Sequence, residues 1–167
     1  RFRHAVHPLR RWRDGMERVQ IEDLHDSSTF TATTSGLSID TALTGIDYLG
    51  DLSKTLALTK NGDNTLTLKG ANTFAGALKI NKGDVVMNGV GNHKIGALTI
   101  ANGTLVLTNI APTYVYVTNS TAIVGNNTTE FGRMTVGGNS AWSSYLPPSG
   151  TGGSVLYVGN NGRGILT

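Results

Sequence analysis

Beyond Ser27 the chain repeats one short hydrophobic pattern, in which two apolar residues flank a third residue and Gly or Asn bounds the group. Because successive side chains of a β-strand point to opposite faces, the two apolar residues of each group would face the same way. Each group therefore predicts one brief strand with a buried face. The pairs are Leu56 and Leu58, Leu66 and Leu68, Leu78 and Ile80, Val85 and Met87, Leu98 and Ile100, and Leu105 and Leu107.

Two of these stretches form an internal repeat of about 20 residues, a period typical of solenoid architectures. The segment "GALKINKGDVVMNG", residues 76–89, aligns without a gap with "GALTIANGTLVLTN", residues 96–109. So short a unit cannot bury its apolar face alone, but stacked copies build a continuous core. We therefore predict an all-β solenoid, a β-helix with one coil per repeat, in which Ile80 and Ile100 lie in register. A leucine-rich horseshoe would need its Asn at a fixed place after the leucines, and a β-sandwich would have longer strands without a sequence repeat.

The small and polar residues of the repeats have predicted structural roles. Glycines would take corner conformations that a side chain would obstruct, and asparagines that precede a Gly would adopt left-handed turns or bond to nearby backbone. Threonines between the inward aliphatic residues would face solvent. The glycines are Gly70, Gly76, Gly83, Gly89, Gly96 and Gly103, the asparagines are Asn61, Asn88 and Asn102, and the threonines are Thr65, Thr67 and Thr99.

The segment 1–27 differs in composition from the rest and holds six of the eight arginines and five of the 11 acidic residues. A helix is predicted from Pro8 to Leu24, because Pro suits a first helical position and apolar residues recur at helical spacing after it. This helix would cap the first coil. The alternative is a partly ordered leader or an added extension. The chain thus divides into residues 1–27, a charged segment, and residues 28–167, the solenoid.

Charge and composition exclude several function classes. The net charge is only +3, and the arginine-rich segment is nearly balanced by acids, so we expect no nucleic-acid partner. The absence of Cys excludes disulfides and thiolate metal sites. No run of 18 apolar residues occurs, so no membrane-spanning helix is expected.

Candidate catalytic groups are few after Ser27. Asp63 and Asp84 are 21 positions apart, so they could be neighbours on successive coils, with Lys60, Lys79 or Lys82 nearby. Such a cluster is what acid/base chemistry on polysaccharides needs. The simpler interpretation is that these are solvated corner charges.

We expect neither a metal nor a cofactor. Three histidines lie in the first segment and His93 stands alone in a predicted loop, so no convergent ligand set is indicated; the other three are His4, His7 and His25. No metal, nucleophile or phosphate-binding motif occurs.

Exposed aromatic residues suggest where the chain could contact a partner. The segment "AWSSYLPPSGTGG" from Ala141 is a predicted protruding loop with Trp142 and Tyr145 at its tip. Tyr114 and Tyr116 alternate with Val and would share one face of a strand. These two tyrosines either form a sugar or protein contact surface or fill a wider coil.

The segment "NGDNTLTLKGANTFAGALKINKGDVVM", residues 61–87, resembles the passenger-associated transport repeat of bacterial autotransporters. That pattern is a Gly-rich turn, a Leu-Thr-Leu strand, Gly-Ala-Asn-Thr-aromatic-x-Gly, and two further strands. The matching positions are Leu66, Leu68, Gly70, Ala71, Asn72, Thr73, Phe74, Gly76, Leu78, Ile80 and Gly83. Weaker similarity occurs in "IVGNNTTEFGRMTVGG" and "VLYVGNNGRGILT".

The resemblance implies a right-handed parallel β-helix that is exported by type V secretion through a C-terminal β-barrel, which this sequence does not contain. We therefore expect a passenger fragment at the bacterial surface or secreted, associated with the outer membrane through that barrel. The expected role is a non-enzymatic scaffold or adhesin that binds host or neighbouring-cell protein or glycan. The alternatives are a filament that assembles through solenoid ends and, third, a polysaccharide-acting enzyme.

Overall fold

The computed structural model describes residues 36–53, 56–109, 115–144 and 155–167. Within these ranges the chain is all-β, with thirteen strands and no helix, so the all-β prediction is confirmed there. The predicted helix from Pro8 to Leu24 and the 1–27 segment lie outside the described residues. Tyr114 and Tyr145 lie outside them as well.

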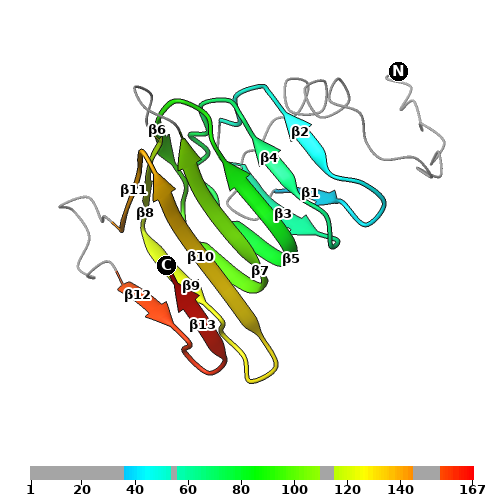
Figure 1. Cartoon of the computed structure of the whole chain (residues 1–167), viewed down its shortest axis with the longest axis vertical. Coiled ribbons are helices and arrows are strands. Elements are labelled where there is room, and N and C mark those ends of the chain that lie inside the picture. Colours follow the sequence, from blue (N-terminus) through cyan, green and yellow to red (C-terminus); the bar gives the residue numbers. More distant parts are fainter. Residues whose placement is uncertain (1–35, 54–55, 110–114, 145–154) are drawn as a thin grey trace, which may run out of the picture.

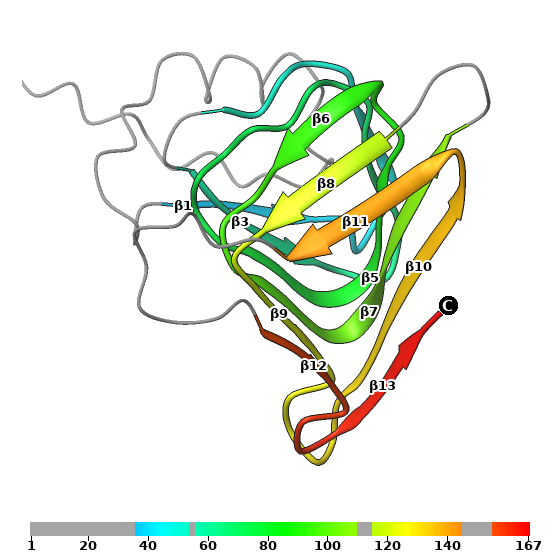
Figure 2. The same cartoon turned by 90° about the vertical axis from the view of Figure 1, so that its left-hand side faces the viewer.

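The strands pair in parallel and form three faces around one core, which Figure 1 and Figure 2 show from two sides. The first face contains β1 (Gly36–Asp40), β3 (Ala57–Asn61), β9 (Thr121–Val124), β12 (Val155–Val158) and the first halves of β5 (Leu78–Met87) and β7 (Leu98–Asn109). The second contains β2 (Ile46–Tyr48), β4 (Leu66–Leu68), β10 (Phe131–Gly138), β13 (Arg163–Leu166) and the second halves of β5 and β7. The third contains β6 (Gly91–Lys94), β8 (Val115–Asn119) and β11 (Ser140–Ser144), which Figure 2 shows opposite the bend in β5 and β7.

The internal repeat sets the register between β5 and β7. Leu78 pairs with Leu98 and Ile80 with Ile100, and all four side chains are 0–1% exposed. The predicted register of Ile80 with Ile100 is therefore confirmed. It also excludes the arrangement in which these two residues lie on separate sheets of a sandwich.

The inward residues of every predicted pair are buried, as the alternating pattern required. Their columns run through the stack, for example from Leu58 through Leu78 to Leu98. Full burial of one such side chain contributes about 1.5–3 kcal/mol, so these columns supply most of the stability of the stack. The outward threonines, Thr65, Thr67 and Thr99, are half-buried.

The strands are longer than the sequence pattern predicted. The two apolar groups of each repeat were expected as separate short strands, yet β5 has 10 residues and β7 has 12. Pairing continues through the bend, where Gly83 lies opposite Gly103. Each repeat therefore contributes one bent strand to two faces, whereas β4 has only the three residues of its apolar group.

Glycine is required at this bend for two reasons. Gly83 has φ 69°, in the left-handed region that side chains disfavour, and an added Cβ would overlap the carbonyl oxygen of Gly62 in the preceding repeat. At the predicted turn before it, the positive φ falls on Gly62 (φ 79°), while Asn61 is the last residue of strand β3. The Asn61 side chain instead bonds to the side chains of Ser38 and Asn81 on the neighbouring strands.

Candidate functional site

Most of the predicted signature residues form part of the stacked core. Leu66 and Leu68 are buried in β4, and Leu78 and Ile80 are buried in β5. Phe74 is fully buried, Ala71 is half-buried and Thr73 is exposed, between the two strands. At Gly70 and Gly76 an added Cβ would overlap backbone carbonyl oxygens of the preceding repeat, so both positions require Gly because of close packing.

Asn72 of the signature joins three repeats through buried hydrogen bonds. Its Oδ1 accepts from the N–H of Leu52 at 3.3 Å, and its Nδ2 donates to the Gly70 carbonyl at 2.7 Å. Its own N–H donates to Nδ1 of His93 at 3.1 Å, and its carbonyl accepts from the N–H of Lys94 at 2.8 Å. Asn72 thus satisfies polar groups that burial would otherwise leave unpaired.

His93 was predicted in a loop, and that prediction is wrong. It lies in β6 and is 1% exposed. Nδ1 accepts from Asn72, so Nε2 carries the proton and donates to the Gly89 carbonyl at 2.7 Å. Burial lowers the pKa of His93 below its usual value, and this outweighs the opposing effects of the Gly89 hydrogen bond and the charge of Asp51. The ring is therefore a neutral structural element at neutral pH.

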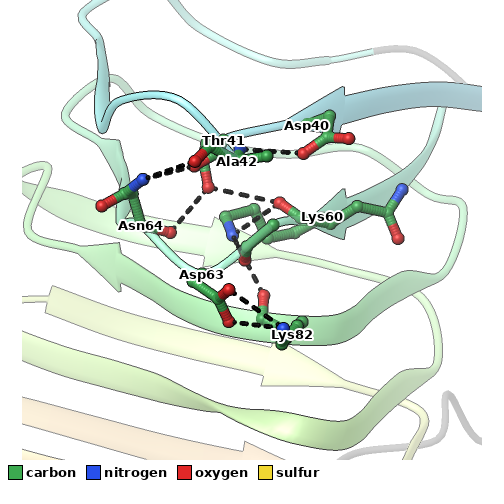
Figure 3. Close-up of polar contacts among 9 residues, drawn as sticks. Asp40, Thr41, Ala42, Lys60, Asp63, Asn64 and Lys82 are labelled. Carbon is green, nitrogen blue, oxygen red and sulfur yellow. Dashed lines mark hydrogen bonds and ion pairs between the residues drawn. The ribbon is translucent and has the colours of Figure 1, made fainter.

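Lys60 is a further buried polar group, and Figure 3 shows its ammonium group among backbone carbonyls. Nζ donates to the carbonyls of Asn61 and Gly62 at 2.8 Å each and to that of Lys82 at 3.0 Å. All three protons of the ammonium group are therefore used. The cluster connects β3, the turn that follows it and the bend of β5.

Lys60 was predicted as a solvated corner charge, which the structure contradicts. Its side chain points inward because it occupies the column position between Ile39 and Ile80. Burial lowers the pKa of Lys60, while the charges of Asp40, Asp84 and Asp63 oppose that effect. The internal repeat could have predicted the burial of Lys60, because Lys60 lies one repeat before Ile80 and so aligns with an inward residue.

The acids and the remaining lysines of the predicted cluster lie at the surface. Asp63 forms an ion pair with Lys82 at 2.9 Å, and their side chains are 71% and 59% exposed. Asp84 is half-buried next to Thr104 on the second face, and Lys79 is exposed opposite Thr99 on the first. In this arrangement Lys60 is committed to carbonyls and Asp63 to a lysine. The contacts of Lys60, Asp63 and Lys82 therefore link neighbouring repeats at the corner of the stack.

Trp142 was predicted at the tip of a protruding loop, which is wrong. It lies in β11 opposite Val117, is partly buried, and packs against the core. Its column on the third face continues from Val117 to His93. The buried Nε1 of Trp142 has no hydrogen-bond partner in the structure described.

No group of three or more His, Cys, Asp or Glu residues in the described ranges could hold a metal ion. In the same ranges there is no helix with the length and apolar character needed to cross a bilayer.

Residues 58–87 match the family model described as Passenger-associated-transport-repeat. The match includes the segment of residues 61–87 on which the resemblance rests, so the recognition of this repeat is confirmed. It runs from within β3 through β4 to the end of β5. Neither the curated proteins nor the solved structures gave a significant match to the chain.

Proposed function

We propose that this chain is a segment of an autotransporter passenger, folded as a right-handed parallel β-helix and displayed at the bacterial surface or secreted. The supporting observation is the passenger-associated transport repeat at residues 58–87, placed within a continuous series of paired repeats. The repeat accounts for the secreted or cell-surface location. Parallel pairing of segments one repeat apart, as between β3, β5 and β7, supports the solenoid geometry.

The proposed role is a non-enzymatic scaffold whose flat faces contact host or neighbouring-cell material. A continuous core with outward polar rows makes a rigid rod, and such a rod presents side chains at fixed spacing. The charged groups that could have served catalysis are held in the hydrogen bonds and ion pairs of the corner, as Lys60 and Asp63 illustrate. This supports a structural over a hydrolytic role.

The location is tested by expressing the full-length gene with an epitope inserted after Leu43 and labelling intact cells. Leu43 suits the insertion because it is 73% exposed in the turn between β1 and β2 and lies outside the paired strands. Labelling of intact cells, lost after external protease treatment, is the expected result. Labelling only after cell lysis would refute the proposal.

The absence of catalysis is tested by incubating the purified chain with acidic and neutral polysaccharides. We expect no increase in reducing ends or in unsaturated uronate absorbance above that of a heat-denatured sample. Saturable product release that disappears in an Asp63→Asn variant would show that the scaffold role is wrong.

Self-assembly into filaments is a second candidate function. In the described part of the chain, β12 and β13 each pair on one side only, and they expose Tyr157, Val158, Ile165 and Leu166. An open, apolar edge strand is a template for pairing with another chain. Sedimentation at increasing protein concentration distinguishes the candidates: a constant monomer mass would exclude filaments, and concentration-dependent polymers would support them.

A further inference from the structure

Two arginines and two apolar residues form a compact patch on the outside of the second face. Phe131 and Arg133 alternate with the buried positions of β10, so both point outward. On the neighbouring strand β13, Arg163 lies opposite Phe131 and Ile165 lies opposite Arg133. Phe131 is 39% exposed and Ile165 is 38% exposed. We call these four residues the arginine–phenylalanine patch.

The aromatic ring and the two cations are in direct contact. The guanidinium carbon of Arg163 lies 5.1 Å from the centroid of the Phe131 ring, and that of Arg133 lies 5.8 Å from it. Such cation–π contacts hold flexible arginine side chains against the ring. The patch therefore presents an ordered apolar surface between two positive charges.

Within the described ranges, neither arginine forms an ion pair with an acid. Glu130 directly precedes β10, and its carboxylate accepts from the N–H groups of Asn126 and Asn127 and from Nδ2 of Asn127. Burial raises the pKa of Glu130, but these hydrogen bonds together lower it below the usual value, so the carboxylate is charged and engaged.

A second acid, Asp84, lies in the same outward row as Arg133, but the row places Thr104 between them. Two strand spacings separate Asp84 from Arg133, or about 10 Å, close to the screening length in physiological salt. The positive charge of the patch thus remains available to a ligand.

Hydrogen-bonding side chains border the patch on β7. Thr104 lies opposite Arg133, and Oδ1 of Asn102 accepts from the N–H of Phe131 at 3.0 Å. The surface therefore combines paired cations, an exposed ring and neighbouring polar groups. The side chains point away from the core, so they stay on the surface whichever segment pairs with the free edge of β13.

We infer that the arginine–phenylalanine patch binds an acidic glycan, through a carboxylate or sulfate group of its sugar units. A guanidinium group can bind such an anion through two parallel hydrogen bonds. The apolar C–H face of a sugar ring can pack on Phe131 and Ile165, while hydroxyl groups bond to the polar border on β7. The inference rests on the proposed surface location and names a ligand class and site for it.

The geometry favours a glycan over a membrane or a nucleic acid. Both guanidinium groups lie against the Phe131 ring, which is 39% exposed, so the ring is not a free apolar anchor of the kind that inserts into lipid. Two cations do not make the continuous basic stripe that tracks a nucleic-acid backbone. One or two sugar units fit a surface two strands wide.

The test measures binding of the 1–167 chain to immobilised heparin, polygalacturonate, neutral dextran and anionic phospholipid vesicles by biolayer interferometry. The main variant is Arg133→Gln with Arg163→Gln, and a matched control with the same loss of charge is Lys69→Gln with Lys94→Gln, away from the patch. Phe131→Leu removes the ring and keeps an apolar side chain. Circular dichroism verifies that each variant is folded.

We expect salt-sensitive binding to heparin or polygalacturonate but not to dextran. The arginine double variant should weaken it by about tenfold or more, because bidentate charged hydrogen bonds are lost. Phe131→Leu should weaken it by about threefold through loss of stacking, and the lysine control should change it less than twofold, roughly the loss expected from charge alone.

Three results would overturn the inference: no binding to either acidic glycan, equal weakening in the arginine and lysine variants, or binding to anionic phospholipid vesicles in place of glycans. Surface labelling of intact cells separates this outcome from failure of the proposed function. Surface-labelled cells with a chain that binds no acidic glycan would refute the inference alone. An intracellular location would refute the proposed function.

Discussion

Replacing Leu98 by Asp tests whether the stacked columns hold the fold together. Leu98 is 1% exposed and lies between Leu78 and Ala122 on the adjacent strands. The change removes the burial of one leucine side chain, about 1.5–3 kcal/mol. It also places an unpaired polar group among aliphatic side chains, at a further cost of roughly 1–3 kcal/mol. The sum, about 2.5–6 kcal/mol, is a large part of the 5–15 kcal/mol typical of a whole domain.

The matched control is Thr99→Asp, one position further along the same strand. Thr99 is half-buried on the outer side and lies opposite Lys79. An aspartate there would face Lys79 and could form a cross-strand ion pair with it. We therefore expect the free energy of unfolding to change by no more than about 0.5 kcal/mol. Urea unfolding followed by circular dichroism gives both free energies. Equal losses for the two variants would refute the assignment of inward and outward positions.

Three further changes test individual features. Lys60→Met should lower the free energy of unfolding in urea by about 1–3 kcal/mol, because three backbone carbonyls lose a charged hydrogen-bond donor. Unchanged or higher stability would show that the cost of desolvating the ammonium group cancels the gain from those bonds. Folding lowers the pKa of His93, so the unfolded chain binds the proton at a higher pH than the folded chain does. The free energy of unfolding should therefore fall as the pH drops below the usual value of 6.5. The loss is up to about 1.4 kcal/mol per pH unit and ends once the pH is below the pKa of the folded state. His93→Gln should remove that part of the slope, and an unchanged slope would contradict the assignment. Gly83→Ala should lower the free energy of unfolding by about 1–3 kcal/mol, because Gly83 has a positive φ. Gly137→Ala should change it by less than about 1 kcal/mol, because an added Cβ there meets nothing within 4 Å. Similar losses at both positions would contradict the requirement for Gly at the bend.

The periodic part of the fold could be predicted from the sequence because the same physical constraint recurs in each repeat. Ile80 and Ile100 had to lie in register, since a slip of one residue would expose every aliphatic side chain of the strand. The strand lengths could not be predicted in the same way. Gly83 and Gly103 read as breaks between short strands, whereas the parallel register carries hydrogen bonds through a bend that only backbone geometry reveals.

The polar residues were harder to place, because their environment depends on the repeats above and below. Lys60 and His93 are chemically suited to solvent, yet each is buried where carbonyls or an amide of neighbouring repeats supply its partners. Trp142 appeared next to a Pro- and Gly-rich segment and was assigned to a loop, but pairing with Val117 turns it inward. The arginine–phenylalanine patch joins residues 32 positions apart, Phe131 and Arg163, and no local pattern connects them.

The distance along the chain between paired strands has a consequence for how the molecule can be assembled. Partners are separated by 19 positions where Leu66 pairs with Val85, and by 34 where Thr121 pairs with Val155. A newly formed turn of the chain therefore docks on the turn made just before it and needs no distant segment to be present. Folding can therefore proceed one turn at a time from a folded end of the stack. The entropic cost of closing each loop rises only slowly as the turns lengthen toward the C-terminus.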